Sequence, residues 1–305
     1  MRVIEGSILG WGEKESIGIY KRILVARTRE QDIEKACQDG GIVTSLLIYA
    51  LTEGHIDGAL VVGRDGWMPI ASIAKTKGEV ISSAMTKYGT TPILKELRSA
   101  VVDHGLSRVC VIGTPCHIQS IRYLQHKNLP LASSVKFTMG LFCRENYEYH
   151  CIEKKVREKG LNIKEIDKFD VSEEFDIYAS GKKLSFPITE VKGCVPKHCL
   201  ICDDFASELA DISIGSDGSP EGWSTIIVRT EEGEDIFSDF ERNKFIETKT
   251  VQNLNYIKEI ADRKREKGKQ TRDIFGLRGE GLGKKEIAAK LGITEDRVSH
   301  RLEGF

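Results

Sequence analysis

The sequence predicts an α/β protein (α+β overall), with an N-terminal α/β layer, a smaller hairpin-rich part and a C-terminal helical tail. Short apolar runs alternate with helical periodicity up to about residue 150, which is typical of strands joined through helices. Short alternating segments separated by turns then follow, and the chain ends in polar sequence with helical spacing. We therefore expect three parts: residues 1–150, 151–257 and 258–305.

The composition limits the possible classes of function. The chain has 305 residues, of which 40% are apolar, enough for a sizeable core in one domain or two. Basic and acidic residues nearly cancel to a net charge of -1, so no global field attracts nucleic acid or an acidic membrane. No apolar run approaches the roughly 18 residues of a membrane span, and no signal-peptide core is present. We expect a cytoplasmic protein, and eight cysteines in a reducing compartment favour a metal site over a disulfide framework.

The first informative stretch follows a predicted strand over residues 18–27. Gly40 and Gly41 open a predicted helix over residues 42–51, with Thr44 in its first turn. A glycine pair at a helix N-terminus lets backbone N–H groups approach an anion, which makes this a candidate phosphate site. An ordinary tight turn explains the same residues.

The next candidate site lies between elements. Residues 58–63 and 70–76 predict strands, and residues 91–102 predict a helix with an early proline. The link before that helix, residues 85–92, combines hydroxyl groups, a cation and an aromatic ring, which suits a nucleotide. An ordinary capped turn is the alternative. Its candidate cofactor-binding residues are Lys87, Tyr88, Gly89 and Thr90.

A second loop is expected at the same edge of the sheet. Residues 108–113 predict a buried strand and residues 117–124 the following helix, so Gly113, Thr114, Pro115 and Cys116 form a strand-to-helix loop. The carboxyl ends of parallel strands are where α/β sheets bind ligands. A further strand, ending at Cys143, brings Arg144 and Glu145 there as well. No G-x-G-x-x-G follows a strand, so a nucleotide would be bound without the Rossmann fingerprint.

The hairpin-rich part is predicted after a charged helix over residues 147–159. Residues 168–171, 175–179 and 183–188 predict antiparallel hairpins, and 210–215 and 225–230 predict strands, with a turn at 231–234.

Three cysteines, Cys194, Cys199 and Cys202, lie within nine residues of one another. Structural zinc sites usually combine two short pairs, whereas 4Fe-4S clusters take closely spaced cysteines plus a distant one. No second C-x-x-C occurs, which favours a 4Fe-4S cluster over zinc. The fourth ligand is Cys143 or its rival Cys116. We expect His198 to be a solvated loop residue, and Cys37, Cys110 and Cys151 to be small core residues.

The tail resembles a helix-turn-helix, because Ile287, Ala288 and Leu291 precede Gly292, and Val298 and Leu302 follow. Glu295 and Asp296 stand where a DNA reader would meet phosphate, so helix capping explains them better. Nucleic acid is therefore not expected as a partner. Because two helices cannot bury a core alone, we expect the tail to dock on a neighbour.

These motifs together resemble the beta-subunit family of coenzyme F420-reducing hydrogenases and dehydrogenases, from about residue 26 to about 259. The resemblance rests on Asp39–Thr44, Lys87–Thr90, Gly113–Cys116, Gly140–Asn146, the three clustered cysteines, and Ala210–Gly215 with Gly222–Thr230. This sequence has Gly-Ser-Asp where relatives tend to have Gly-Asp, which displaces Asp217 by one residue. The resemblance does not cover the tail beyond about residue 269.

The resemblance implies FAD, a 4Fe-4S cluster and hydride exchange with the 8-hydroxy-5-deazaflavin coenzyme F420. Gly40, Gly41, Lys87 and Thr90 would then hold the FAD pyrophosphate, and residues 113–116 would approach the isoalloxazine. Cys143, Cys194, Cys199 and Cys202 would hold the cluster, while Arg144, Lys192 and Lys197 would meet the anionic coenzyme tail. Expected partners are the nickel-iron large subunit and the iron-sulfur small subunit of a hydrogenase. A formate dehydrogenase is the alternative, and other open classes are a zinc-stapled binding module with a DNA-reading tail and a related flavoenzyme acting on another substrate.

Overall fold

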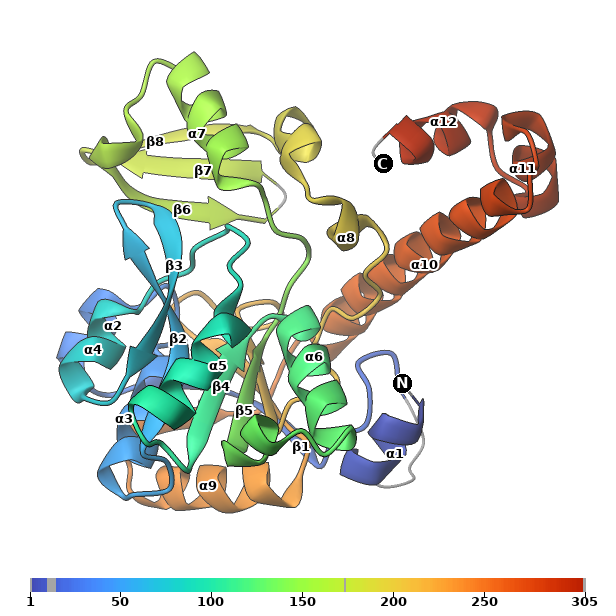
Figure 1. The fold of residues 1–305 in the computed structure, drawn as a ribbon. Coiled ribbons are helices and arrows are strands. Elements are labelled where there is room, and N and C mark those ends of the chain that lie inside the picture. Colours follow the sequence, from blue (N-terminus) through green and yellow to red (C-terminus); the bar gives the residue numbers. More distant parts are fainter. Residues whose placement is uncertain (1, 10–14, 173, 304–305) are drawn as a thin grey trace. The chain divides into compact units, whose positions relative to one another are not determined.

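The computed structural model describes residues 2–9, 15–172 and 174–303 of the chain (Figure 1). The chain divides into two compact units: unit 1 comprises Met1–Cys143 and Asp204–Ile260, and unit 2 comprises Arg144–Asp203 and Ala261–Phe305. The chain therefore passes from unit 1 to unit 2 after Cys143, returns to unit 1 at Asp204, and ends in unit 2.

Unit 1 contains an eight-stranded mixed sheet in the order β11-β1-β10-β9-β5-β4-β2-β3. Its strands are β1 (Arg22–Thr28), β2 (Gly58–Asp65), β3 (Met68–Ala74), β4 (Val109–Gly113), β5 (Val135–Leu141), β9 (Ile212–Gly215), β10 (Ser224–Val228) and β11 (Ile246–Lys249). The central strands β4 and β10 are buried along their whole length, as their continuous apolar sequence predicts.

Five strands of this sheet point the same way. β2, β4, β5 and β9 are parallel neighbours, and β1 is antiparallel to β10, which is itself antiparallel to β9. β1, β2, β4, β5 and β9 therefore all end at one edge of the sheet, here called the carboxyl edge.

Helices cover both faces of this sheet. The helices of unit 1 are α1 (Arg2–Leu9), α2 (Gln31–Ala36), α3 (Ile42–Thr52), α4 (Lys77–Ser82), α5 (Glu96–Arg98), α6 (Pro115–His126) and α9 (Glu231–Arg242). Alternate residues of β4 show the two layers, because Cys110 and Ile112 pack in the cluster containing α3 and α9. Val109 and Val111 belong to the cluster containing α6.

Unit 2 contains a three-stranded antiparallel sheet formed by β6 (Ile166–Val171), β7 (Glu174–Ala179) and β8 (Lys182–Pro187). Aromatic rings hold it together: Phe175 is paired with Phe186 across the strands and also contacts Tyr147 and Phe169. The helices of this unit are α7 (Tyr149–Glu158), α8 (Lys197–Leu200), α11 (Lys284–Leu291), α12 (Glu295–Glu303) and most of α10 (Leu254–Gly279).

The C-terminal tail has its own small core. Ile274 and Leu277 of α10 are buried with Ile287 and Ala288 of α11 and with Val298 of α12. Gly292 closes α11 in the left-handed conformation, with a φ of 64°, as the helix-turn-helix spacing predicts. The expectation that this helix pair docks on a neighbour is confirmed within the chain, because the end of α10 supplies the third helix.

The structure corrects three predictions. Residues 231–234 begin helix α9 rather than form a turn, with the Thr230 hydroxyl accepting a hydrogen bond from the Gly233 N–H at 3.1 Å. Residues 93–103 form short 3-10, α and π segments instead of one regular helix. β9 and β10, which were assigned to the hairpin part, instead complete the large sheet, so the domain division at 150 and 257 does not match the two compact units.

Candidate cofactor site and cysteine loop

The carboxyl edge of unit 1 brings together loops that are distant in the sequence. Gly40 accepts a hydrogen bond from the Thr28 N–H at the end of β1, at 2.7 Å, which places the start of α3 at this edge. Residues 113–116 follow β4, Cys143 follows β5, and Asp217 follows β9. Thr44 lies there too, but it is almost fully buried in α3.

His117 joins two of the predicted loops. Its Nδ1 accepts a hydrogen bond from the Thr114 N–H at 3.3 Å, and its Nε2 lies 2.9 Å from the Thr91 carbonyl oxygen. These two partners assign a neutral imidazole that donates from Nε2. The 85–91 link and the 113–116 loop are therefore fixed against each other by a residue that sequence reasoning did not select.

Lys87 occupies a half-buried position within the 85–91 link. Its ammonium group donates to the carbonyl oxygens of Ser83 and Ala84, the latter at 2.7 Å. Burial lowers the pKa of Lys87 to about 7, and the positive charge of Arg64 acts in the same direction. A cation with so low a pKa becomes fully charged when an anion binds beside it.

Three of the four candidate glycines, Gly40, Gly41 and Gly113, each have a structural reason. A Cβ on Gly40 would lie 2.6 Å from the backbone of both Ala26 and Ser224, so strands β1 and β10 pass too close for a side chain. Gly41 has a φ of 72° and is the N-cap of α3. A Cβ on Gly113 would lie 2.7 Å from the His117 Cβ. Tight packing therefore accounts for these glycines, alongside the access that they give to the α3 N-terminus.

The thiol of Cys116 is exposed, and its Sγ lies 3.2 Å from the Thr114 hydroxyl. Cys143 is half-buried, and its N–H donates to the Phe205 carbonyl oxygen at 2.9 Å. The carbonyl oxygen of Asp217 accepts a hydrogen bond from the Thr225 hydroxyl at 2.8 Å, which ties the end of β9 to β10.

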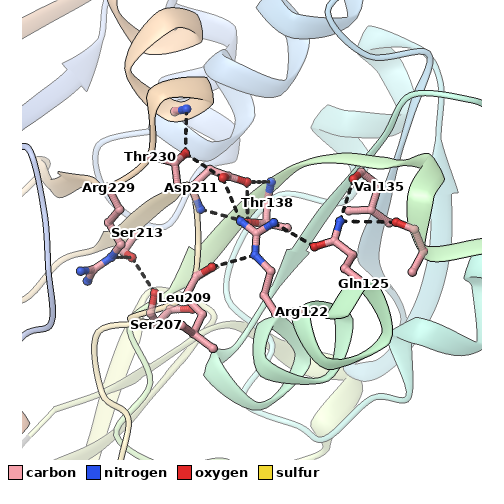
Figure 2. A network of polar contacts seen from close by, with 12 residues as sticks. Arg122, Gln125, Val135, Thr138, Ser207, Leu209, Asp211, Ser213, Arg229 and Thr230 are labelled. Atoms are coloured by element: carbon pink, nitrogen blue, oxygen red, sulfur yellow. Dashed lines mark hydrogen bonds and ion pairs between the residues drawn. The ribbon is translucent and has the colours of Figure 1, made fainter. Parts of the chain in front are cut away.

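A buried polar network lies at the amino end of β9, away from this edge, and joins strands to helices of unit 1 (Figure 2). The Asp211 carboxylate accepts hydrogen bonds from Arg122 at 2.8 Å, from the N–H and hydroxyl of Thr138 at 2.8 Å, and from Thr230 at 2.7 Å. These partners come from α6, β5 and the residue before α9, so one carboxylate connects three elements. Because all its partners are paired in the interior, removing one would leave others buried and unsatisfied.

Arg229 extends the buried polar region. Its guanidinium donates to the Ser213 hydroxyl at 2.7 Å, to the Ile19 carbonyl at 2.9 Å and to the Ala206 carbonyl at 3.0 Å. Complete burial lowers the pKa of Arg229 to about 10, while the charge of Glu208 opposes that shift. Its contacts are with neighbouring backbone and a serine, which is a structural role.

The cysteine loop of unit 2, residues 194–203, is compact and local. Cys194 ends a 3-10 segment over Ile188–Cys194, and its carbonyl oxygen accepts from the Glu148 N–H at 2.8 Å. Cys199 lies in the short helix α8, with its N–H donating to the Pro196 carbonyl at 2.9 Å. His198 is exposed, as expected.

Cys194 is joined to Cys151 of α7 by a disulfide, with the two Cα atoms 5.4 Å apart. Cys151 is therefore not an isolated core residue, and Cys194 is not a thiolate in this form of the chain. Cys110 is fully buried as predicted, whereas the half-buried Cys37 donates to the Asp39 carbonyl oxygen at 2.8 Å. Among the described residues, no three His, Cys, Asp or Glu side chains are arranged to hold a metal ion.

The structure thus brings most predicted residues of unit 1 to one edge, and it keeps Cys194, Cys199 and Cys202 on one loop of unit 2. The expected coenzyme-binding cations all belong to unit 2, with Lys192 and Lys197 exposed and Arg144 half-buried. Sequence reasoning missed His117, Cys151 and Asp211. A local signal existed only for His117, which is the third residue after the N-cap Thr114.

Within the described residues, no helix has both the length and the apolar character needed to cross a membrane.

Comparisons with known proteins agree on one family. The model for the N-terminal part of the coenzyme F420 hydrogenase/dehydrogenase beta subunit matches residues 23–98, and the model for its C terminus matches residues 106–253. The coenzyme F420 hydrogenase subunit beta of Methanothermobacter thermautotrophicus is 36% identical over 265 residues, covering 83% of this chain and 94% of the relative. The corresponding subunit of Methanosarcina barkeri is 34% identical, covering 87% and 96%.

A solved structure is also similar. One chain of the F420-reducing [NiFe] hydrogenase complex from Methanosarcina barkeri matches with a TM-score of 0.84 and 32% identity, over 88% of this chain and 97% of that chain. Both halves of the beta-subunit model and relatives of nearly equal length therefore match this sequence. The chain belongs to the coenzyme F420 hydrogenase/dehydrogenase beta-subunit family.

Proposed function

We propose that this chain is the beta subunit of an F420-reducing hydrogenase and that it transfers electrons from partner subunits to coenzyme F420. The observation that carries the proposal is the likeness to a chain of the F420-reducing [NiFe] hydrogenase complex, which extends over 97% of that chain. The expected partners are accordingly a nickel-iron large subunit and an iron-sulfur small subunit, assembled with this chain as a hetero-oligomer.

The carboxyl edge of unit 1 is the proposed FAD site. Between Gly41, beyond β1, and Thr114, beyond β4, lie four strand spacings, or about 19 Å, a span that suits an extended dinucleotide better than a mononucleotide. The N-terminus of α3 and the ammonium group of Lys87 supply the positive charge that a pyrophosphate requires. Tyr88, Gly89, Thr90 and Asp217 complete the proposed lining.

FAD, when bound, can exchange single electrons with an iron-sulfur cluster and a hydride with a deazaflavin, which is the conversion that this reaction needs. The chain's own residues supply binding and position. His117 holds the Thr91 carbonyl and the Thr114 N–H in a fixed relation, so the two loops present one surface to a ligand. Lys87 neutralises phosphate charge, and the tightly packed glycines keep the edge free of side chains.

The cysteine loop is the proposed site of a 4Fe-4S cluster. Its donor chemistry fits, because unit 2 carries four cysteines, Cys151, Cys194, Cys199 and Cys202. The disulfide must first be reduced, since a thiolate binds iron and a disulfide sulfur does not. We propose Cys194, Cys199, Cys202 and Cys143 as the ligands. Cys116 remains a rival for the fourth position, and Cys151 becomes one because it lies beside Cys194.

Serine variants distinguish these candidates for the fourth ligand. If Cys143 is that ligand, Cys143→Ser loses cluster iron, while Cys116→Ser and Cys151→Ser retain it after anaerobic purification. Iron retained in Cys143→Ser, with loss in one of the other two variants, would assign the ligand to that residue instead.

The anionic tail of coenzyme F420 is proposed to meet Arg144, Lys192 and Lys197. Lys192→Ala should raise the KM for the coenzyme and leave reduction of artificial dyes unchanged. Lys182→Ala, which removes an equally exposed lysine from the start of β8, is the matched control. An unchanged KM in Lys192→Ala would remove this residue from the site.

The electron donor needs a direct test, because one relative combines this module with other sequence. The chain is 33% identical to the coenzyme F420-dependent sulfite reductase of Methanocaldococcus jannaschii but spans only 45% of that protein. The beta-subunit module therefore also occurs fused to other sequence, so the donor has to be identified directly. A formate dehydrogenase remains an alternative donor.

Copurification tests the proposed assignment. The tagged chain, isolated anaerobically from its native cells, should bring down a nickel-containing large subunit and reduce coenzyme F420 with hydrogen. Reduction with formate and without hydrogen would identify the dehydrogenase alternative. Absence of F420 reduction with either donor, in a preparation that contains the partner subunits, would contradict the proposal.

A further inference from the structure

Helix α10 passes the cysteine loop at the distance of backbone contact. A Cβ placed on Gly268 would lie 2.5 Å from the Cys202 carbonyl oxygen, 2.9 Å from the Cys202 carbonyl carbon and 3.1 Å from the Ile201 carbonyl oxygen. These are backbone atoms of the loop, which cannot rotate away as the end of a flexible side chain can. Only glycine fits at this position without displacing either the helix or the loop.

The same face of α10 also binds the loop through a charged side chain. Arg272, one turn after Gly268, donates to the Ile201 carbonyl oxygen at 2.5 Å and to the Asp203 carboxylate at 2.7 Å. The two partners flank Cys202, so the planar guanidinium holds the loop on both sides of this cysteine. One turn of α10 therefore fixes three consecutive loop residues, Ile201, Cys202 and Asp203.

The residue before Gly268 ties α10 to another part of unit 2, outside the cysteine loop. Lys267 forms an ion pair with Glu145 at 3.1 Å, near the start of unit 2. All three α10 residues lie beyond residue 253, where the match to the family model ends. Contacts to the cysteine loop therefore also come from a segment that this model does not describe.

We propose that α10 is a positioning element for the cysteine loop, in which the close contact at Gly268 and the paired guanidinium of Arg272 fix Cys202 for metal binding. This inference rests on the proposed function only in taking Cys199 and Cys202 as cluster ligands. Residues that support metal ligands from behind control how firmly the metal is retained. Helix α10 then acts in cofactor retention.

The sharpest test compares two glycine-to-alanine variants within the same helix. Gly276 also lies in α10, but an added Cβ there has no atom within 4 Å. Intrinsic helix propensity favours alanine at both positions, so Gly276→Ala should raise the unfolding temperature and keep its iron. Gly268→Ala should instead lose iron, by about tenfold during anaerobic desalting with a chelator.

Arg272 provides a second variant that keeps the helix backbone unchanged. Arg272→Gln should lower iron retention and alter the electron paramagnetic resonance spectrum of the reduced cluster, with Arg272→Lys recovering only part of the retention because lysine lacks the planar fork. Arg265→Gln, which removes an ion pair to Asp262 on the same helix, is the control and should leave both readouts unchanged.

These measurements separate failure of the inference from failure of the proposed function. If wild-type protein binds no iron, the cluster proposal fails, and α10 is then tested by the rate at which Cys199 and Cys202 are alkylated. That rate should rise in Gly268→Ala and in Arg272→Gln but not in Gly276→Ala. The inference would be overturned if Gly268→Ala and Arg272→Gln both had the iron content, the spectrum and the alkylation rate of the wild type.

Discussion

The carboxyl edge of unit 1 and the cysteine loop of unit 2 are stabilised in different ways. The edge is the end of five aligned strands, and a saturated network centred on Asp211, at the other end of β9, joins β5, α6 and the start of α9. The loop is held by one crosslink to α7 and by contacts from α10, a helix that follows it by some 50 residues. The proposed flavin site is therefore preformed by the sheet, whereas the proposed cluster site depends on the oxidation state of its cysteines and on α10.

The largest effect is expected from Asp211→Ala, which should destabilise unit 1 and leave the cysteine loop of unit 2 unchanged. It leaves the buried Arg122 guanidinium without its carboxylate, which should cost about 3–5 kcal/mol of unfolding free energy. The described tryptophans, Trp67 and Trp223, lie buried in unit 1, so urea unfolding followed by tryptophan fluorescence reports this unit. Asp239→Ala, which removes an exposed partner of Arg242, should cost below about 1 kcal/mol. Equal losses in the two variants would contradict the role given to the network.

The next largest effect is expected from loss of the disulfide, which should destabilise unit 2 and leave unit 1 unchanged. In air-oxidised, iron-free protein, Cys151→Ser should lose about 2–4 kcal/mol from the crosslink between residues 43 positions apart. The loss should appear in the circular dichroism transition of unit 2 and leave the tryptophan transition in place. Reductant should lower wild-type stability to that of the variant, and Cys37→Ser should behave as wild type. Wild-type stability that reductant does not change would argue against the disulfide.

These two regions also differ in how far the sequence predicted them. Apolar strands with loops at Gly40, Lys87 and Gly113 predicted the edge, because strand order in parallel units places such loops together. The acidic start of α9 was misassigned as a turn although Thr230 is a good N-cap. The contacts of Cys151 and Gly268 with the cysteine loop leave no local pattern, because they join residues that only the folded chain brings together.

Protonation of Lys87 should make the flavin affinity of the carboxyl edge depend on pH. Lys87 has a pKa of about 7 in the ligand-free chain. Above pH 7 it must therefore take up a proton before its charge can pair with a bound phosphate. Flavin affinity should therefore be greatest below pH 7. It should fall above pH 7, approaching tenfold, or about 1.4 kcal/mol, per pH unit until the pKa of the complex is reached.

Titration of the iron-free protein with FAD between pH 6 and 9 checks this dependence. Lys87→Gln should bind FAD more weakly at pH 6 and should lose the pH dependence. If the wild-type protein and Lys87→Gln had the same profile, Lys87 would not contact the phosphates.

The smallest effect is expected at the link between the two loops. His117→Ala removes the partners of the Thr91 carbonyl and the Thr114 N–H, so FAD affinity should fall by about 1 kcal/mol, or roughly fivefold. Isothermal titration at pH 6 measures the change, and the nearby exposed His126→Ala is the control. Equal affinity in wild type and His117→Ala would show that the two loops bind independently.

The most direct test of the account is an ultraviolet-visible spectrum of the anaerobically purified protein, with flavin, iron and zinc assayed on the same sample. We expect flavin bands over a broad iron-sulfur absorption, with about four irons per chain, and bleaching of the flavin by reduced coenzyme F420. A colourless protein with one zinc, or a coloured one that reduced F420 leaves unchanged, would contradict it.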